Sequence, residues 1–207
     1  MSSDRTARGA DALRLVRIVD VRGAHDVARV EACLRGGVSA LWLRDPAATG
    51  RELFEAALVL RGPTRARASE LWIGDRVDVA IACGADGVQL GRRAVPPERV
   101  RAWYAGRMGV SCHDEDELRA AEAAGADHVV VSPVFAVPDK GPALGLLGLR
   151  ALAARTRLPV VALGGIGASE VASVRSLGVA GVAVARALSE AADPRAVAQA
   201  LAGMTTP

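Results

Sequence analysis

Short apolar runs rich in β-branched residues alternate with amphipathic segments of Ala, Leu and Arg along this chain, at a period of about 25 residues. The alternation repeats eight times. Such a pattern is typical of β-α units, whose strands form a parallel sheet. Eight right-handed units in 207 residues predict a closed (β/α)8 TIM barrel built as a single domain. The alternative is an open doubly wound sheet, but no GxGxxG phrase follows the first predicted strand.

The boundaries of the predicted elements follow from the same pattern. The eight predicted strands are Leu15–Val19, Val38–Leu43, Glu70–Ile73, Gly87–Leu90, Met108–Ser111, His128–Ser132, Val160–Leu163 and Gly181–Ala185. The helices are predicted to begin near Ala24, Thr49, Arg76, Pro97, Asp114, Leu146, Ser169 and Asp193. Thr49 and Ser169 are suitable helix caps, and Pro97 suits a first helical turn. Glycines before the strands are expected to end helices in a left-handed conformation, namely Gly36-Gly37, Gly84, Gly125 and Gly178.

The barrel is predicted to span residues 15–205, preceded by a polar extension over residues 1–14. No apolar run approaches the roughly 20 residues that cross a bilayer, and residues 1–11 lack the apolar stretch of a signal peptide. The three cysteines, Cys33, Cys83 and Cys112, are spaced unlike a disulfide framework or paired zinc knuckles. We therefore expect a cytoplasmic chain with reduced thiols and no membrane partner.

The charge of the chain is positive but dispersed. The formal net charge is +3, the sequence pI is about 9.1, and six residues are aromatic. Scattered positive charge with few side chains for stacking argues against nucleic acid as a partner.

The candidate functional residues follow the predicted strands. In a (β/α)8 barrel the active site forms at the carboxyl ends of the strands, because the loops there carry polar side chains while the interior is packed. The positions that this rule selects are Asp20, Arg44, Asp45, Asp75, Gln89, Arg92, Ser111, His113, Ser132, Lys140, Gly164, Gly165 and Arg186. Among them, Gln89, Ser111 and Ser132 are candidate substrate-binding groups.

The segments after the seventh and eighth predicted strands are expected to bind phosphate. Gly164 and Gly165 leave the backbone bare, so that its N–H groups can approach an anion closely. The eighth strand ends at Val184 and Ala185, and Arg186 adds a cationic donor beside them. Barrels most often hold phosphate between these two loops. The alternative is a pair of glycines needed only for a tight turn.

Three further polar groups each have two interpretations. Arg44 ends an apolar strand, and it is either a ligand group at the barrel mouth or half of a surface pair with Asp45. Asp75 is either a magnesium ligand or a cap of the helix that follows it. A hard cation usually needs more than one carboxylate or the substrate's own phosphates, and the spacing alone favours capping. His113 is either a structural residue or a proton-transfer group.

Lys140 lies in a long segment after the sixth predicted strand, residues 132–142, which contains three prolines. It is the one lysine against twenty-five arginines, so it is either a leftover surface residue or a group kept for a specific contact. We expect the segment to act as a lid that carries Lys140 over a phosphate.

Six phrases along the chain point to one family. They are LWLRD at 41–45, GDRVDVAIACGADGVQLG at 74–91, GVSCH at 109–113, GADHVVVSPVF at 125–135 with the lysine beyond it, LPVVALGGI at 158–166 and GVAGVAVARAL at 178–188. Together the phrases resemble the thiamine-phosphate synthase and TenI superfamily of (β/α)8 barrels. The resemblance implies a phosphorylated thiazole as ligand and, as in other barrels of this family, a homodimer.

The resemblance implies two different reactions. Synthases of this family join a pyrimidine methyl diphosphate to a thiazole phosphate: magnesium helps the diphosphate leave, a pyrimidine carbocation forms, and the thiazole nitrogen captures it. TenI-type tautomerases instead aromatise a thiazole phosphate carboxylate by proton transfer. Magnesium is therefore expected only if this chain is a synthase, and no other cofactor is expected.

The motifs of both activities are incomplete in this chain. Of the synthase motif Gln-x-Arg-x-Lys only Arg44 remains. The second metal-binding aspartate of the synthases has become Ala94, which leaves Asp75 as a weak metal candidate. The histidine that tautomerases carry after the sixth strand falls at Pro133, which cannot transfer a proton.

Three hypotheses follow. The first is a TenI-like tautomerase, in which Arg44 pairs with the substrate carboxylate and His113, Lys140 or a bound water transfers the proton. The second is a divergent synthase, in which Arg92 and Arg93 replace magnesium in neutralising diphosphate. The third is a non-catalytic protein that binds thiazole phosphate or thiamine phosphate, or a partner subunit.

Overall fold

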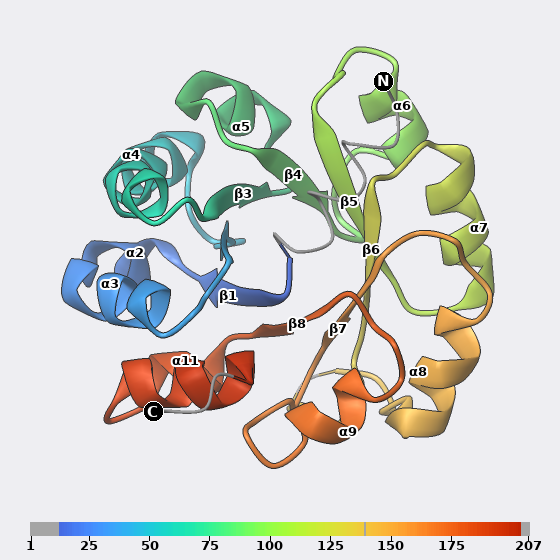
Figure 1. Cartoon of the computed structure of the whole chain (residues 1–207). Coiled ribbons are helices and arrows are strands. Elements are labelled where there is room, and N and C mark those ends of the chain that lie inside the picture. The colour runs from blue at the N-terminus through green and yellow to red at the C-terminus, as the bar shows by residue number, and fades with distance from the viewer. Residues whose placement is uncertain (1–12, 139, 204–207) are drawn as a thin grey trace.

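The computed structural model of the chain is a closed barrel of eight parallel strands ringed by helices (Figure 1). The structure describes residues 13–138 and 140–203. The strands pair in chain order and β1 pairs with β8, which closes the barrel. They are β1 (Leu15–Val19), β2 (Ala40–Leu43), β3 (Glu70–Gly74), β4 (Gly87–Leu90), β5 (Arg107–Cys112), β6 (His128–Val131), β7 (Val160–Leu163) and β8 (Gly181–Val184). The predicted (β/α)8 barrel is confirmed.

The strands separate two hydrophobic cores, because successive residues of a strand point to opposite faces. The side chains inside the barrel form one apolar cluster, made of Leu13, Val16, Ala40, Trp42, Trp72, Val130, Val161 and Ala183. The outward side chains pack against the helices in a larger cluster. The barrel interior is therefore filled, and inward-facing residues reach solvent only at the ends of the strands.

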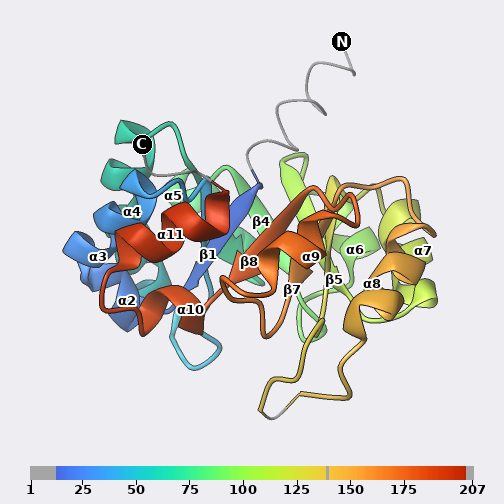
Figure 2. The ribbon, with the colours of Figure 1, turned by 60° about the horizontal axis from the view of Figure 1, so that its bottom comes forward.

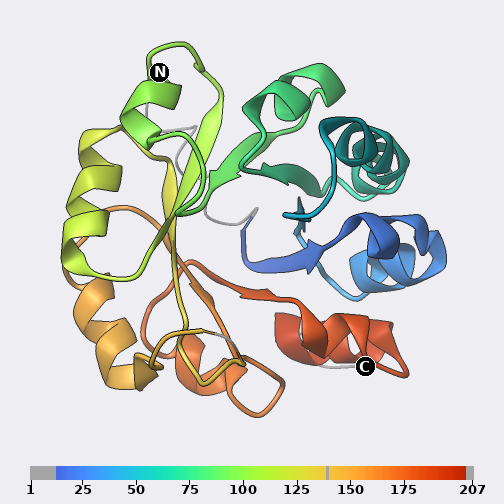
Figure 3. The same cartoon turned by 180° about the vertical axis from the view of Figure 1, so that it is seen from behind.

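Ten helices lie in the described residues. They are α2 (Val21–His25), α3 (Val27–Arg35), α4 (Gly50–Ala66), α5 (Val77–Cys83), α6 (Pro97–Arg101), α7 (Glu115–Ala123), α8 (Gly145–Ala153), α9 (Val171–Arg175), α10 (Arg186–Ser189) and α11 (Pro194–Ala202). Two helices follow β1 and two follow β8, where the sequence predicts one each. Seen from behind, α11 lies beside α3, which closes the ring of helices (Figure 3). None of these helices has both the length and the apolar surface that crossing a bilayer requires.

Most predicted boundaries are confirmed. The limits of β1, β4 and β7 match the prediction, β5 is one residue longer at each end, and the other strands differ by one or two residues at one end. Thr49 caps α4 in a capping box with Glu52, and Pro97 opens α6. The glycines at 37, 84, 125 and 178 have φ angles between 63° and 100°. The Ser169 cap is wrong: α9 begins at Val171, and the Ser169 hydroxyl donates to the side chain of the neighbouring Glu170 instead.

The loops at the carboxyl ends of the strands gather at one end of the barrel. Figure 2 shows the segments between β2 and α4 and between β6 and α8 projecting from this end. Of the predicted domain limits, residues 1–12 of the extension and residues 204–205 of the barrel lie outside the described residues. The carboxyl end of the barrel is where the sequence places the functional residues.

Candidate active site at the barrel mouth

A cavity of about 540 Å³ opens at the carboxyl end of the barrel. It brings together most of the predicted site residues, and we call it the cationic cavity because, among its described side chains, four are arginines or lysine and one is a carboxylate. Its lining includes Arg44, Asp75, Arg92, Arg93, Ser111, His113, Ser132, Lys140, Gly164 and Ala185.

Arg44 enters this cavity because β2 alternates inward side chains, with Trp42 inside the barrel and Arg44 two residues further on. Gly74 on the neighbouring β3 leaves the space for both: a Cβ there would lie 2.9 Å from Trp42 Nε1 and 3.1 Å from Arg44 Cγ. Asp45 does not pair with Arg44 but accepts hydrogen bonds from the backbone N–H groups of Val21 and Ala47. The interpretation of Arg44 as half of a surface pair with Asp45 is therefore wrong.

Asp75 joins the ends of β3 and β4. Its Oδ1 accepts a hydrogen bond from the Gly91 N–H at 2.7 Å, and its own φ is 62°, in the left-handed region. The helix that follows is α5, whose N-cap is Arg76 without a side-chain cap hydrogen bond. The capping interpretation of Asp75 is thus wrong, and its carboxylate forms part of the cavity wall instead.

Glu117 on α7 holds two groups of the cationic cavity, and sequence reasoning missed it. Its Oε2 accepts hydrogen bonds from the backbone N–H of His113 at 2.7 Å and lies 2.8 Å from His113 Nδ1. Its Oε1 accepts from Arg92 Nε at 3.1 Å. Partial burial tends to raise the pKa of Glu117, but the hydrogen bonds from His113 and the charge of Arg92 outweigh it and hold the pKa below its ordinary value. Glu117 is therefore an anion that orients both neighbours.

Cys112, beside His113, points away from the cavity into the outer core and is fully buried. Burial, with the nearby carboxylates of Glu117 and Asp114, raises the pKa of its thiol to about 12. The thiolate is the nucleophilic form of cysteine, so Cys112 is not a nucleophile here.

Gln89 lies one layer below the cavity, buried inside the barrel at 2% exposure, and it does not line the cavity wall. Its Oε1 accepts a 2.8 Å hydrogen bond from His128 Nε2, and its Nε2 donates to the Ser111 hydroxyl at 3.3 Å. His128 is 3% exposed and packs edge-on against Trp72. Because Ser111 Oγ accepts from Gln89, its own proton is free for an acceptor in the cavity. Gln89 thus supports Ser111, and His128 is a site-supporting residue that the sequence analysis did not select.

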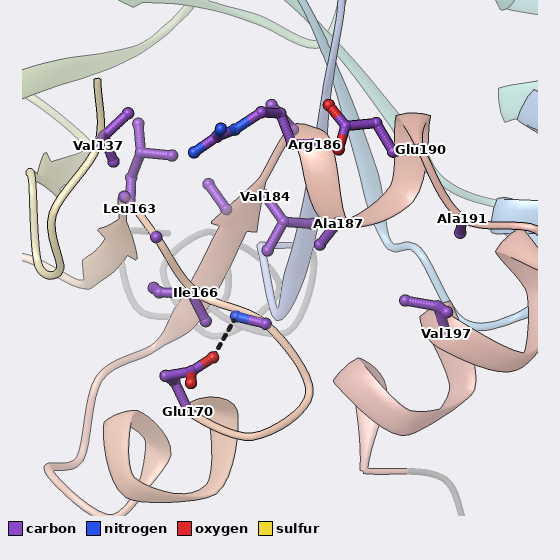
Figure 4. Close-up of a pocket in the computed structure, with 15 residues that line it drawn as sticks. Val137, Leu163, Ile166, Glu170, Val184, Arg186, Ala187, Glu190, Ala191 and Val197 are labelled. Carbon is purple, nitrogen blue, oxygen red and sulfur yellow. Dashed lines mark hydrogen bonds between the residues drawn. The ribbon is translucent and has the colours of Figure 1, made fainter. Parts of the chain in front are cut away.

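A second cavity of about 470 Å³ lies between the loops after β7 and β8, and we call it the glycine-loop cavity (Figure 4). Its lining includes Gly164, Gly165, Ile166, Gly167, Glu170, Val184, Ala185, Arg186, Ala187 and Glu190. Within the described chain, the backbone N–H groups of residues 165, 166, 186 and 187 donate to no other group. Unpaired N–H groups around a cavity are suited to an anion.

One donor of the glycine loop is already engaged. The Gly167 N–H donates to Glu170 Oε2 at 3.0 Å, drawn as a dashed line in Figure 4. Hydrogen bonds from Ser169 and from this N–H hold the pKa of Glu170 below its ordinary value. An anion in this cavity would therefore use the other N–H groups, and Glu170 marks the edge of the space that it can occupy.

The two cavities adjoin. Val137, Leu163, Gly164 and Ala185 line both of them. A single mouth thus offers two neighbouring compartments, one with bare backbone and one with cationic side chains.

The residues present do not fit a protein-held magnesium ion. A hard divalent cation takes several oxygen ligands. In the described chain no three His, Cys, Asp or Glu side chains lie together as a metal site. Among the residues that the structure describes, Asp75 is the one carboxylate on the wall of the cationic cavity, and the sequence places Ala94 where a second is expected.

The molecule is a (β/α)8 barrel whose candidate site lies at the carboxyl ends of the strands and is formed mainly by the loops. The profile of the family described as "Thiamine monophosphate synthase" matches residues 15–188. The chain belongs to this family.

Named relatives span most of the chain. It is 38% identical over 189 residues to a thiamine-phosphate synthase of Chloroflexus aurantiacus, covering 89% of this chain and 88% of that protein. It is 40% identical over 191 residues to a putative thiamine-phosphate synthase of Geobacter sulfurreducens, covering 89% and 90%.

A solved structure of similar sequence has the same fold. The thiamine phosphate pyrophosphorylase from Pyrococcus furiosus matches with a TM-score of 0.87 and 35% identity, over 94% of this chain and 96% of that one. A 3-hexulose-6-phosphate synthase matches at 18% identity and a TM-score of 0.66, which shows the shared barrel fold alone.

Proposed function

We propose that this protein joins a pyrimidine methyl diphosphate to the ring nitrogen of a thiazole phosphate and so forms thiamine phosphate. The observation that carries the proposal is the pair of adjoining cavities at one barrel mouth, since a coupling reaction needs two phosphorylated substrates side by side. The relatives named as thiamine-phosphate synthases, at 38% and 40% identity, support this synthase hypothesis over the tautomerase that we expected first from the sequence.

The thiazole phosphate would occupy the glycine-loop cavity. The free N–H groups of residues 165, 166, 186 and 187 are donors for its phosphate, and Arg186 supplies a positive charge at the rim. The backbone of Gly164, Val184 and Ala185 closes the cavity on the side of the barrel. The thiazole ring then faces the wall that the two cavities share.

The pyrimidine diphosphate would occupy the cationic cavity. The bond between its methylene carbon and the diphosphate oxygen breaks, and the electron pair leaves with the oxygen. The lone pair of the thiazole nitrogen then forms the new carbon–nitrogen bond at the same methylene. Arg44, Arg92, Arg93 and Lys140 would stabilise the leaving negative charge, and Ser111 and Ser132 would donate hydrogen bonds to the substrates.

A second candidate function is the tautomerase. It is favoured because Asp75 has no second carboxylate beside it among the described lining residues of the cationic cavity, which leaves the metal site of a synthase incomplete. Proton transfer on a thiazole phosphate carboxylate needs no diphosphate leaving group. His113, held by Glu117, lines the cavity and is its candidate proton-transfer group, with Arg44 as partner of the substrate carboxylate.

An incubation of the purified protein with both synthase substrates, in parallel with the thiazole phosphate carboxylate alone, tests the proposal. We expect coupled thiamine phosphate, detected by liquid chromatography and mass spectrometry. Isomerisation of the thiazole without coupling would support the tautomerase instead, and tight binding without turnover would support a non-catalytic binder.

The variant Arg44→Ala tests, in the same assay, the role of Arg44 in coupling. Loss of a cation from the cavity should lower kcat/KM for coupling by about a hundredfold, in line with a charge-assisted contact worth roughly 3 kcal/mol. The matched control is Arg67→Ala, an exposed arginine at the end of α4 that precedes β3, on the opposite face of the barrel. Equal rates for the two variants would contradict a role for Arg44.

A further inference from the structure

The cationic cavity carries far more positive than negative charge, and this imbalance has a specific origin in the chain. Arg44 comes from the end of β2, Arg92 and Arg93 from the loop between β4 and α6, and Lys140 from the loop between β6 and α8. Asp75 is the single carboxylate among the lining side chains of residues 13–138 and 140–203. Such a wall suits a multiply charged anion. It disfavours a divalent cation, because the cation would lie next to arginine and lysine side chains of the same charge.

The donors of these arginines are available to a ligand. Arg92 is 67% exposed and uses its Nε for Glu117, which leaves both terminal nitrogens of the guanidinium without a partner in the described chain. Within the same residues, Arg44 and Arg93 form no ion pair. A guanidinium presents a planar fork of N–H donors that matches phosphate oxygens two at a time.

The Asp75 carboxylate also supports the loop that follows β4. Its Oδ1 is engaged by the Gly91 N–H, one residue before Arg92. The same contact fixes the start of the loop that carries Arg92 and Arg93 beside the cavity. The Asp75 carboxylate thus fixes the position of Gly91, and Arg92 and Arg93 are the next two residues of the chain.

The residues that line the cationic cavity do not fit a metal site. We therefore infer that Arg92 and Arg93, with Arg44 and Lys140, form a diphosphate site that needs no divalent cation. The identity of the substrate that carries the diphosphate rests on the proposed function, whereas the anion site itself does not. When the substrate's carbon–oxygen bond breaks, the electron pair stays on the diphosphate, and the guanidinium groups neutralise it there. The methylene carbon forms its new bond to the thiazole nitrogen, so the step needs no proton and no reactant besides the two substrates.

Calorimetric titration with inorganic pyrophosphate as its sodium salt tests the inference. We expect binding in the presence of EDTA at constant ionic strength, with an affinity that added Mg²⁺ does not increase. The double variant Arg92→Ala/Arg93→Ala should bind at least about tenfold more weakly, which corresponds to about 1.4 kcal/mol. Both side chains are exposed, so circular dichroism should show an unchanged fold.

The control variant is Arg67→Ala, which removes the same charge at the far end of the barrel and should bind pyrophosphate as the unchanged protein does. The inference is overturned if pyrophosphate binds only after Mg²⁺ is added, or if the double variant binds as tightly as the control.

The coupling assay, run with EDTA and with Mg²⁺, separates this inference from the proposed function. Metal-free pyrophosphate binding without coupling under either condition would leave the anion site and remove the proposed function. Coupling that appears only with Mg²⁺, together with Mg²⁺-dependent pyrophosphate binding, would leave the proposed function and remove the inference.

Discussion

A glycine on β5 makes room for the buried contact beneath the cationic cavity. A Cβ on Gly109 would lie 2.1 Å from Gln89 Oε1 and 2.3 Å from His128 Nε2, on top of the hydrogen bond that joins them. We expect Gly109→Ala to lower the free energy of unfolding by about 2–3 kcal/mol, because overpacking adds to the loss of a buried hydrogen bond. Urea unfolding measures this. The control is Gly141→Ala, whose Cβ would meet nothing within 4 Å, and equal stabilities would refute the explanation.

At the scale of single residues, the sequence predicts those site groups whose place is set by the alternation along a strand. Arg44, Ser111 and Ser132 are inward positions at or just beyond strand ends, so counting along the strand finds them. Gln89 has the same inward direction, but it pairs with Gly109, two residues before Ser111 on β5, so it lies one inward position below the mouth. Counting along a strand cannot find Glu117, because it lies on α7. It contacts His113, which follows β5, and Arg92 in the loop after β4.

At the scale of elements, the loops after β6 and β7 support each other through two glycines. Gly164 and Gly165 have φ angles of 109° and 65°, and a Cβ on Gly164 would lie 2.8 Å from Pro133 Cα. The close approach of the loop that carries Lys140 is thus enough to require the bare backbone. Sequence reasoning treated a tight turn and a phosphate site as alternatives, but this packing is compatible with both. The short helices α2 and α10 were missed because each has at most five residues and lies just before a longer helix, α3 or α11, so that the sequence pattern shows one helix where there are two.

Gly164→Ala tests this packing. We expect a loss of about 2 kcal/mol in the free energy of unfolding, from the strained φ and from overpacking against the backbone of the β6 loop. Affinity for thiazole phosphate should fall as well, since Gly164 lines both cavities. Thermal unfolding and calorimetric titration measure the two effects. Gly178→Ala is the control, because its φ is also positive, at 76°, but its Cβ would meet nothing within 4 Å and it lines neither cavity. If the two variants bind and unfold alike, the packing argument fails.

At the scale of the whole molecule, the barrel interior ties the stability of the fold to pH through one histidine. Complete burial, and then the nearby charge of Arg107, lower the pKa of His128 from 6.5 to about 3. The unfolded chain binds a proton at this residue below about pH 6.5, whereas the folded chain does not until about pH 3. The contribution of His128 to stability is therefore complete above pH 6.5 and is lost progressively as the pH falls towards 3. Between pH 7 and pH 5 the expected loss is about 2 kcal/mol.

Urea unfolding at pH 7 and pH 5 isolates this contribution when the protein is compared with His128→Asn. The other titrating groups are the same in both proteins, so their contributions cancel when the two pH-dependent changes are compared. Between pH 7 and pH 5 the free energy of unfolding of the unchanged protein should fall by about 2 kcal/mol more than that of the variant. This difference does not depend on how much the substitution changes stability at pH 7. A His25→Gln chain, which loses an exposed histidine instead, serves as the comparison for removal of an imidazole. Parallel losses in the unchanged protein and in His128→Asn would mean that His128 takes up its proton in the folded barrel. The hydrogen bond to Gln89 does not forbid this, since Nε2 is the donor in either form and Nδ1 has no partner in the described chain. It is burial in the apolar interior, rather than that contact, which keeps the imidazole neutral while it supports Ser111 from below.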